Sequence, residues 1–187
     1  MKIVKWKKVK SEIEYKGKRV IVSNDHFVLP NGNVTEYSIV MKGPVVAVLA
    51  ITSDNKIILV EQFRPAVNEI TLDLPGGGVN TRENETPLAA AKRELKEETG
   101  YSAENFSQLC NFFYPDSGRT NQKRYIYVAT NLIKGEPMTE DNELIKIHEV
   151  SIKDVLKKIK IGKYNEVTLS LALLLWNFQN LYFNKNS

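Results

Sequence analysis

Three glutamates with helical spacing are the residues of this chain best suited to chemistry. Glu94, Glu97 and Glu98 stand at positions i, i+3 and i+4, so they share one face if the segment is a helix. Like charges at these spacings destabilise a helix by about 0.2–0.5 kcal/mol per pair. A hard divalent cation such as Mg²⁺, which prefers carboxylate oxygens, would remove that repulsion. The glutamates are therefore candidate metal ligands, with a solvated acidic surface stripe as the alternative.

A helix over residues 87–99 is predicted to position these glutamates. The segment is rich in Ala, Leu, Lys, Arg and Glu, which are strong helix formers. Thr86 is a predicted N-cap, Pro87 fits the first helical position, and Gly100 fits the end of the helix. Just upstream, a short strand-like run ends in the sequence Pro-Gly-Gly-Gly (75–78), whose glycines let the backbone approach a ligand closely. Strand, glycine loop and carboxylate helix together predict a cradle for metal and phosphate.

This segment resembles the Nudix box, Gly-x5-Glu-x7-Arg-Glu-U-x-Glu-Glu-x-Gly-U, in which U is a bulky apolar residue. The matching residues, from the first glutamate of the box onward, are Glu85, Arg93, Glu94, Leu95, Glu97, Glu98, Gly100 and Tyr101. The loop departs from the pattern. Counted from Gly77, the spacer before Glu85 covers residues 78–84, so it is seven residues long and exceeds the family pattern by two.

Similarity to the ADP-ribose pyrophosphatase branch of the Nudix family extends along nearly the whole chain. The matching segments are Tyr15–Val20, Leu29–Gly32, Val60–Pro65, Leu74–Gly77 and Gly162–Asn165, with Pro115 fifteen residues beyond Gly100. This branch also includes GDP-mannose hydrolases. The resemblance implies an α+β fold, namely a Nudix α/β/α sandwich with a mixed sheet, plus a small N-terminal antiparallel β subdomain. We place the subdomain at residues 1–42 and the Nudix domain at residues 43–187.

Local patterns give the expected elements. Residues 30–33, Pro-Asn-Gly-Asn, carry a hairpin signal. The predicted strands are Lys18–Val22, Thr35–Met41, Val45–Thr52, Ile57–Gln62 and Lys123–Thr130, and the further predicted helices are Ser151–Lys160 and Asn165–Tyr182.

The resemblance also implies roles for the box residues. Glu94 and Glu98 are expected to be the principal Mg²⁺ ligands, with Mn²⁺ as the alternative ion. Glu97 is expected to be a supporting ligand with a catalytic role, and the backbone carbonyl of Gly76 matches a further ligand. Metal ions of this kind neutralise a pyrophosphate, orient it and activate the attacking water.

Other carboxylates of the family pattern have counterparts here. Arg93 is expected to pair with Glu85 and so hold the loop on the helix. Glu143 best matches a loop carboxylate that binds metal or serves as the base, with Asp141 and Glu140 as alternatives. A solvated acidic loop is the competing interpretation.

Substrate-binding candidates lie outside the box. Arg64 is the best candidate for a phosphate clamp, because a guanidinium fork suits phosphate oxygens; a structural ion pair is the alternative. Arg119 and Lys123 are candidates for the second phosphate or the sugar, against a purely structural role. Phe27, or Trp6, could stack on a purine, against packing in a core or dimer.

The predicted activity is Mg²⁺-dependent hydrolysis of the pyrophosphate bond of a nucleotide sugar, ADP-ribose to AMP and ribose 5-phosphate. The alternatives are GDP-mannose or another nucleotide sugar, and a non-catalytic nucleotide-sensing Nudix module. An enzyme acting on capped RNA has only the basic start Lys5–Lys10 in its favour. We expect a homodimer, because relatives exchange their N-terminal strands and the hairpin edge would otherwise be exposed.

Composition sets further bounds. The chain has 187 residues and a net charge of +4, so a nucleic-acid partner is not expected. The single cysteine, Cys110, excludes an intrachain disulfide, and His26 and His148 lack ligand spacing. No signal peptide is evident in Met1–Lys10, and the longest apolar run, Leu169–Trp176, is too short for a bilayer. A cytoplasmic location without membrane contact is the resulting expectation.

Overall fold

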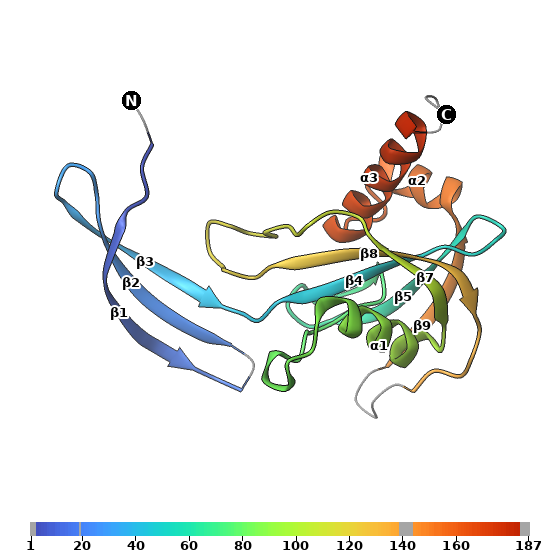
Figure 1. The fold of residues 1–187 in the computed structure, drawn as a ribbon, viewed down its shortest axis with the longest axis horizontal. Helices are drawn as coiled ribbons and strands as arrows, with labels where there is room; N and C mark the ends of the chain where they lie inside the picture. The colour runs from blue at the N-terminus through green and yellow to red at the C-terminus, as the bar shows by residue number, and fades with distance from the viewer. Residues whose placement is uncertain (1–2, 19, 139–143, 184–187) are drawn as a thin grey trace. The chain divides into compact units, whose positions relative to one another are not determined.

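The protein, seen in a computed structural model that describes residues 3–18, 20–138 and 144–183, forms nine strands, three α-helices and one 3₁₀ turn in this described part (Figure 1). It divides into two compact units, one of Met1–Pro44 with Phe113–Arg124 and one of Val45–Phe112 with Tyr125–Ser187. The division after residue 44 lies near the predicted boundary after residue 42. The sequence did not indicate that residues 113–124 group with the N-terminal strands.

The N-terminal unit is built on an antiparallel sheet in the order β1-β2-β3. Its strands are β1 (Lys7–Lys16), β2 (Ile21–Val28) and β3 (Val34–Met41). The predicted hairpin joins β2 and β3, with Gly32 at φ +87°, a conformation that glycine adopts readily. The prediction of a strand over Lys18–Val22 was wrong in its start, because β2 begins only at Ile21. Segment 113–124 lies beside β3, since the Val40 N–H donates to the Arg119 carbonyl at 2.8 Å.

The second unit carries two three-stranded sheets in the orders β4-β8-β7 and β6-β5-β9. The strands are β4 (Val45–Ala50), β5 (Lys56–Arg64), β6 (Glu69–Asp73), β7 (Ser102–Gln108), β8 (Arg124–Ile133) and β9 (Ile145–Ser151). The helices are α1 (Pro87–Thr99), α2 (Ile152–Lys160) and α3 (Val167–Phe183), and η1 (Thr81–Glu83) is the 3₁₀ turn. Helix α1 lies on one side of the strands, and α2 and α3 lie on the other (Figure 1).

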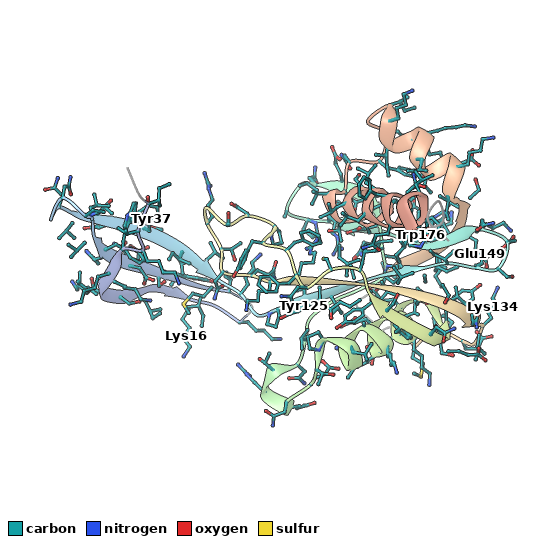
Figure 2. The ribbon with its side chains drawn as sticks, turned by 45° about the horizontal axis from the view of Figure 1, so that its top comes forward. Lys16, Tyr37, Tyr125, Lys134, Glu149 and Trp176 are labelled. Atoms are coloured by element: carbon teal, nitrogen blue, oxygen red, sulfur yellow. The ribbon has the colours of Figure 1, made fainter. Side chains whose placement is uncertain are left out.

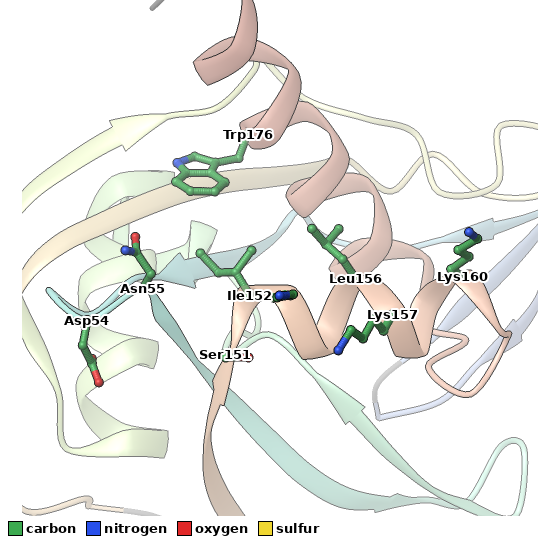
Figure 3. Close-up of a pocket in the computed structure, with 9 residues that line it drawn as sticks. Asp54, Asn55, Ser151, Ile152, Leu156, Lys157, Lys160 and Trp176 are labelled. Carbon is green, nitrogen blue, oxygen red and sulfur yellow. The ribbon is translucent and has the colours of Figure 1, made fainter.

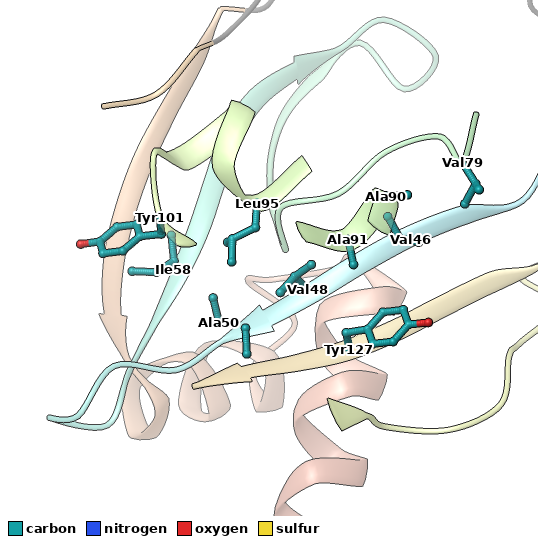
Figure 4. Close-up of a cluster of buried hydrophobic side chains, with 11 residues drawn as sticks. Val46, Val48, Ala50, Ile58, Val79, Ala90, Ala91, Leu95, Tyr101 and Tyr127 are labelled. Atoms are coloured by element: carbon teal, nitrogen blue, oxygen red, sulfur yellow. The ribbon is translucent and has the colours of Figure 1, made fainter. Parts of the chain in front are cut away.

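Both faces of β4 are apolar, because its side chains alternate between two faces that are each buried. Val46, Val48 and Ala50 join the core cluster beneath α1 together with Leu95 (Figure 4). Because successive side chains of a strand point to opposite faces, Leu49, which has no exposed surface, points the other way. A strand covered by helices on both faces is expected to read as a continuous apolar run, as β4 does.

The predicted α+β class is confirmed. The strands of the second unit form two three-stranded sheets. The first is mixed: β7 and β8 pair antiparallel, whereas β4 and β8 run in the same direction (Figures 1 and 4). The predicted core role of Leu169–Trp176 is confirmed for Leu169, Ala172 and Leu173, which are buried. Within the described residues, no helix has the length and apolar character needed to cross a bilayer.

Candidate active site

Helix α1 has both of its predicted ends. The Thr86 hydroxyl accepts a hydrogen bond from the Ala89 N–H at 3.2 Å, and Pro87 is the first helical residue. Gly100 ends the helix in the left-handed region, at φ +74°, with its N–H donating to the Lys96 carbonyl. These local signals set the two ends of the helix, and Leu95, which has no exposed surface, faces the core.

Arg93 lies at the centre of the polar face of α1. Its Nε donates to Glu85 at 2.8 Å, which confirms the predicted ion pair. One terminal nitrogen donates to Glu94 at 2.8 Å and to Glu97 at 2.9 Å. The other donates to the Gly78 carbonyl at 2.9 Å and to Glu85 at 3.2 Å. The guanidinium therefore contacts three carboxylates, whose combined negative charge exceeds its own, and holds the loop against the helix.

The longer loop does not prevent this arrangement. The loop contains the turn η1, after which Asn84 adopts a left-handed conformation at φ +57°. Beyond the turn, the Glu85 carboxylate accepts a third hydrogen bond, from the Asn80 N–H at 2.7 Å. The sequence had no signal for the role of Asn80, because the contact is made by backbone.

Glu98 is nearly buried, with 7% of its surface exposed, and accepts a hydrogen bond from the Gly76 N–H at 2.8 Å. Val46 and Val48 donate to the carbonyls of Gly77 and Pro75, so the glycine segment runs antiparallel to β4. Between these two bonded residues, the Gly76 N–H turns to Glu98 instead of to β4. The expected role of the Gly76 carbonyl as a metal ligand stays a prediction.

Glycine at position 77 leaves room for the Glu94 carboxylate. A Cβ built on Gly77 would lie 2.5 Å from a carboxylate oxygen of Glu94, and one on Gly76 would lie 2.2 Å from the Val46 carbonyl oxygen. A side chain at position 77 would displace the Glu94 carboxylate, whereas one at position 76 would meet the backbone of β4. The sequence signal for this contact was the glycine run itself, although it did not indicate which residue each glycine meets.

Carboxylates and one peptide carbonyl make up the candidate ligand set, and these are the donors that Mg²⁺ prefers. In the described part of the chain, no three acidic or histidine side chains already enclose one point. Arg93 instead bridges Glu94 and Glu97. The residues nevertheless fit a hard divalent cation, because Glu94, Glu98 and the Gly76 carbonyl offer oxygens from the helix and the adjoining segment.

The electrostatics of the site follow from these contacts. Hydrogen bonds from Arg93, with a smaller contribution from the Asn80 N–H, lower the pKa of Glu85. The same carboxylates, Glu85 first, raise the pKa of Arg93.

At the other end of α1, burial and a 2.6 Å hydrogen bond to Glu149 raise the pKa of Tyr101 to about 12. Lys134 lies 3.8 Å from the same Glu149 carboxylate (Figure 2).

The predicted substrate residues are distributed over both units. Arg64 is exposed at the end of β5, opposite Glu69 of β6. Arg119 and Phe27 belong to the N-terminal unit, where the Phe27 ring meets Tyr37 edge-on with centroids 5.9 Å apart. Trp6 lies 6.0 Å from the same tyrosine ring. The predicted stacking residues thus pack within their own sheet, which leaves their role toward a substrate a prediction.

The predicted loop carboxylate, Glu143, lies outside the described residues, as do its alternatives Asp141 and Glu140. Its role therefore stays a prediction.

A cavity of about 730 Å³ lies away from the carboxylates of α1 (Figure 3). It is bounded by the β4–β5 turn, α2 and α3, and its apolar lining comes from Ile152, Leu156 and Trp176. Among the described residues that line it, Asp54 is the one acidic residue, so this cavity does not repeat the chemistry of α1.

Fold and site together define a Nudix protein. The family model described as NUDIX domain matches residues 41–169, and the chain belongs to this family. The prediction from the box residues that the chain is a Nudix hydrolase is thereby confirmed.

The chain is also similar to individual proteins of known activity and structure. The chain is 32% identical over 175 residues to the ADP-ribose pyrophosphatase of Bacillus subtilis, covering 92% of this chain and 93% of that protein. It is 34% identical over 161 residues to the methanol dehydrogenase activator of Bacillus methanolicus, covering 85% of each. A solved structure described as an ADP compounds hydrolase superposes with a TM-score of 0.84 at 21% identity, covering 96% of both chains, and so supports the fold.

Proposed function

We propose that the protein hydrolyses the pyrophosphate bond of a nucleotide sugar in a Mg²⁺-dependent reaction, and that ADP-ribose, cleaved to AMP and ribose 5-phosphate, is the preferred substrate. The proposal rests on the carboxylates of α1. Glu98 contacts Gly76 and Glu94 lies against Gly77, while Glu97 shares the Arg93 guanidinium with Glu94. The similarity to an ADP-ribose pyrophosphatase over 92% of the chain supports the choice of substrate.

Each residue of the site has a proposed role. Glu94, Glu98 and the Gly76 carbonyl would hold the metal ion, with Glu97 supporting them. A bound Mg²⁺ neutralises pyrophosphate charge and lowers the pKa of water. Arg93 orients the glutamates and, with Glu85, keeps the loop in place. Glu143 is the proposed additional ligand or base.

The substrate roles are also proposals. Arg64 would donate a bidentate pair of hydrogen bonds to a phosphate. Arg119 would contact the second phosphate or the sugar, and Phe27 the base. Neither Arg64 nor Arg119 is held in an ion pair with the described residues, so both are available to an anionic ligand.

A product analysis tests the function. The full chain is incubated with Mg²⁺ and, in separate reactions, ADP-ribose, GDP-mannose, a dinucleoside polyphosphate and NADH. We expect AMP from ADP-ribose at the highest rate. Faster release of GMP from GDP-mannose would assign the substrate to the alternative sugar, and no turnover of any compound would support a nucleotide-sensing module.

The variant Glu98→Gln tests the metal assignment. It keeps the shape and one acceptor oxygen of the side chain but removes its charge, and we expect the rate to fall by about 100-fold. The matched control is Glu104→Gln, on exposed β7, which should keep the wild-type rate. Near-wild-type turnover by the Glu98→Gln variant would remove Glu98 from the ligand set.

The relative from Bacillus methanolicus supports a second candidate, activation of a dehydrogenase, because it is 34% identical over 85% of the chain. Adding the protein to a purified methanol dehydrogenase tests it. An increased dehydrogenase rate that the Glu98→Gln variant no longer produces would link the two activities.

We also propose that the protein is a homodimer formed through the N-terminal sheet. Every residue of β1 is exposed in the isolated chain, including the apolar Val9, Ile13 and Tyr15. Such a strand normally needs cover. Light scattering at micromolar concentration should give twice the mass of 21.3 kDa; the mass of one chain would refute the proposal.

A further inference from the structure

A second cavity carries polar side chains that the proposed hydrolysis does not use. Its volume is about 390 Å³, within the range of roughly 300–1,000 Å³ typical of small-molecule pockets. Strands β5, β6 and β9 form its floor, and the C-terminal half of α2 with the following segment forms its wall. The lining residues that matter here are Glu61, His148, Lys158, Lys163 and Tyr164.

Strand register places this cavity on the face of the sheet opposite α1. Ile58 belongs to the core beneath α1, and Ile147, which is paired with Val60, packs against that core. Because side chains alternate along a strand, Glu61 on β5 and His148 on β9 point to the other face. The cavity is therefore separate from the carboxylates that the proposed hydrolysis needs.

One end of the cavity is formed by a polar pair. The Nε2 atom of His148 lies 3.0 Å from a carboxylate oxygen of Glu61, and 30% of the His148 side chain is exposed. Leu72 and Val150 supply apolar surface beside this pair. Glu61 keeps further acceptor capacity on its carboxylate, so the pair can receive a hydrogen bond from a ligand hydroxyl.

The other end of the cavity is cationic. Lys158 lies in the last turn of α2, and Lys163, just after the helix, donates its backbone N–H to the Lys158 carbonyl at 2.9 Å, so both lysines line the same end of the cavity. The Lys158 ammonium lies 2.9 Å from the hydroxyl of Tyr164, a neutral partner. Lys163 enters no ion pair with the described residues. Among the described residues that line this cavity, Glu61 is the one carboxylate, and it is engaged by His148. Asp154, one helical turn before Lys158, acts on that lysine from outside the lining, so a ligand anion would be the partner of the two ammonium groups inside the cavity.

We propose that this cavity binds a small organic phosphate monoester. Its phosphate would accept hydrogen bonds from the ammonium groups of Lys158 and Lys163, and hydroxyl groups of its organic part would reach Glu61 and His148. A monoester suits two ammonium groups because it carries close to two negative charges at neutral pH and three acceptor oxygens. The volume excludes a large ligand, and the Glu61–His148 pair favours a hydroxylated one.

Histidine signals in proton NMR spectra offer a direct test. The chain has two histidines, so a His26→Gln variant assigns the His148 imidazole signals. The full chain is titrated with glucose 6-phosphate in the absence of divalent cations, which suppresses binding at α1. We expect the His148 signals to move and saturate while those of His26 stay in place. Unchanged His148 signals would overturn the proposal.

Matched lysine variants locate the phosphate. Lys163→Gln should raise the dissociation constant by about tenfold, as expected for the loss of one charge-assisted hydrogen bond. Lys160→Gln makes the same charge change at an exposed residue that lines the cavity of Figure 3, and it should bind as wild type does. Equal binding by the Lys163→Gln variant and the wild type would contradict the phosphate position.

Two further probes define the ligand class. Glucose and inorganic phosphate should each bind more weakly than glucose 6-phosphate. Equal affinity for glucose would refute the phosphate contact, and equal affinity for inorganic phosphate would refute the ester. The Glu98→Gln variant should bind normally, so this test is independent of whether the proposed hydrolysis occurs.

Discussion

The α1 region and the β1–β3 sheet differ in how far their apolar side chains are buried. On the buried face of α1, Ala91 and Leu95 have no exposed surface, and on its polar face Arg93 contacts three glutamates. In β1, by contrast, every residue is exposed, with Ile13 at 56% and Tyr15 at 57%. One region is complete within a single chain, whereas the other presents apolar surface to water.

This difference shows where each region obtains its stability. A three-stranded sheet without a covering layer has only a small core of its own, whereas α1 packs on strands that are buried on both faces. The α1 region should therefore respond to mutation within one chain. The N-terminal sheet should respond through its proposed partner.

The largest expected effect on stability comes from removing a buried side chain of α1. Leu95→Ala removes a fully buried side chain and should lower the free energy of unfolding by about 2–5 kcal/mol, measured by urea denaturation. Leu88→Ala, at a position 37% exposed on the same helix, is the control and should cost less than about 1 kcal/mol. Equal losses would show that α1 does not depend on the core of Figure 4.

A charge placed in β1 tests the other region. Ile13→Asp should weaken the proposed dimer by about 2–3 kcal/mol, which raises its dissociation constant by roughly 100-fold. Analytical ultracentrifugation over a concentration series measures this change. Ile133→Asp, at an apolar residue 55% exposed on β8, is the matched control and should leave the dimer intact. If both variants associate like the wild type, the N-terminal sheet is not the interface.

The smallest expected effect on stability comes from removing the charge of Glu85, the ion-pair partner of Arg93. Glu85→Gln should lower the free energy of unfolding by about 1–2 kcal/mol at pH 7, because the charged partner of Arg93 is lost. The folded-state pKa of Glu85 lies below its usual value of 4.5. Its stabilisation is therefore present above pH 4.5 and is lost as the pH falls through the lower, folded value.

Unfolding measured from pH 7 to pH 3 checks this. The curves of the wild type and the Glu85→Gln variant should converge at the acidic end. Glu83→Gln, at an exposed residue two positions earlier, should follow the wild type throughout. A constant gap between the Glu85→Gln variant and the wild type at all pH values would attribute the loss to packing rather than charge.

Much of α1 could be predicted because its signals are local. The N-cap Thr86, the first-turn Pro87 and the left-handed Gly100 act on residues within about one helical turn, and the structure has all three where predicted. The Glu85–Arg93 pair followed from the family resemblance and is also present. The start of β2 was misplaced, because the strand is set by pairing with β1 and β3 rather than by the apolar run alone.

Contacts between distant segments could not be predicted in this way. His148 had no ligand spacing in the sequence, yet it meets Glu61 from a position 87 residues away. Likewise, residues 113–124 gave no sign that Arg119 would accept a hydrogen bond from β3. In each case the contact depends on which strands or segments become neighbours.

By itself, the sequence determined the helix of glutamates, its two ends, the glycine segment before it and membership of the Nudix family. Only the tertiary structure decided that Gly76 donates to Glu98, that Gly77 makes room for Glu94, and that Glu61 and His148 share a cavity behind the sheet. The physical reason is strand register. A shift of one residue in a strand reverses the face of every side chain, and pairing between distant segments sets that register.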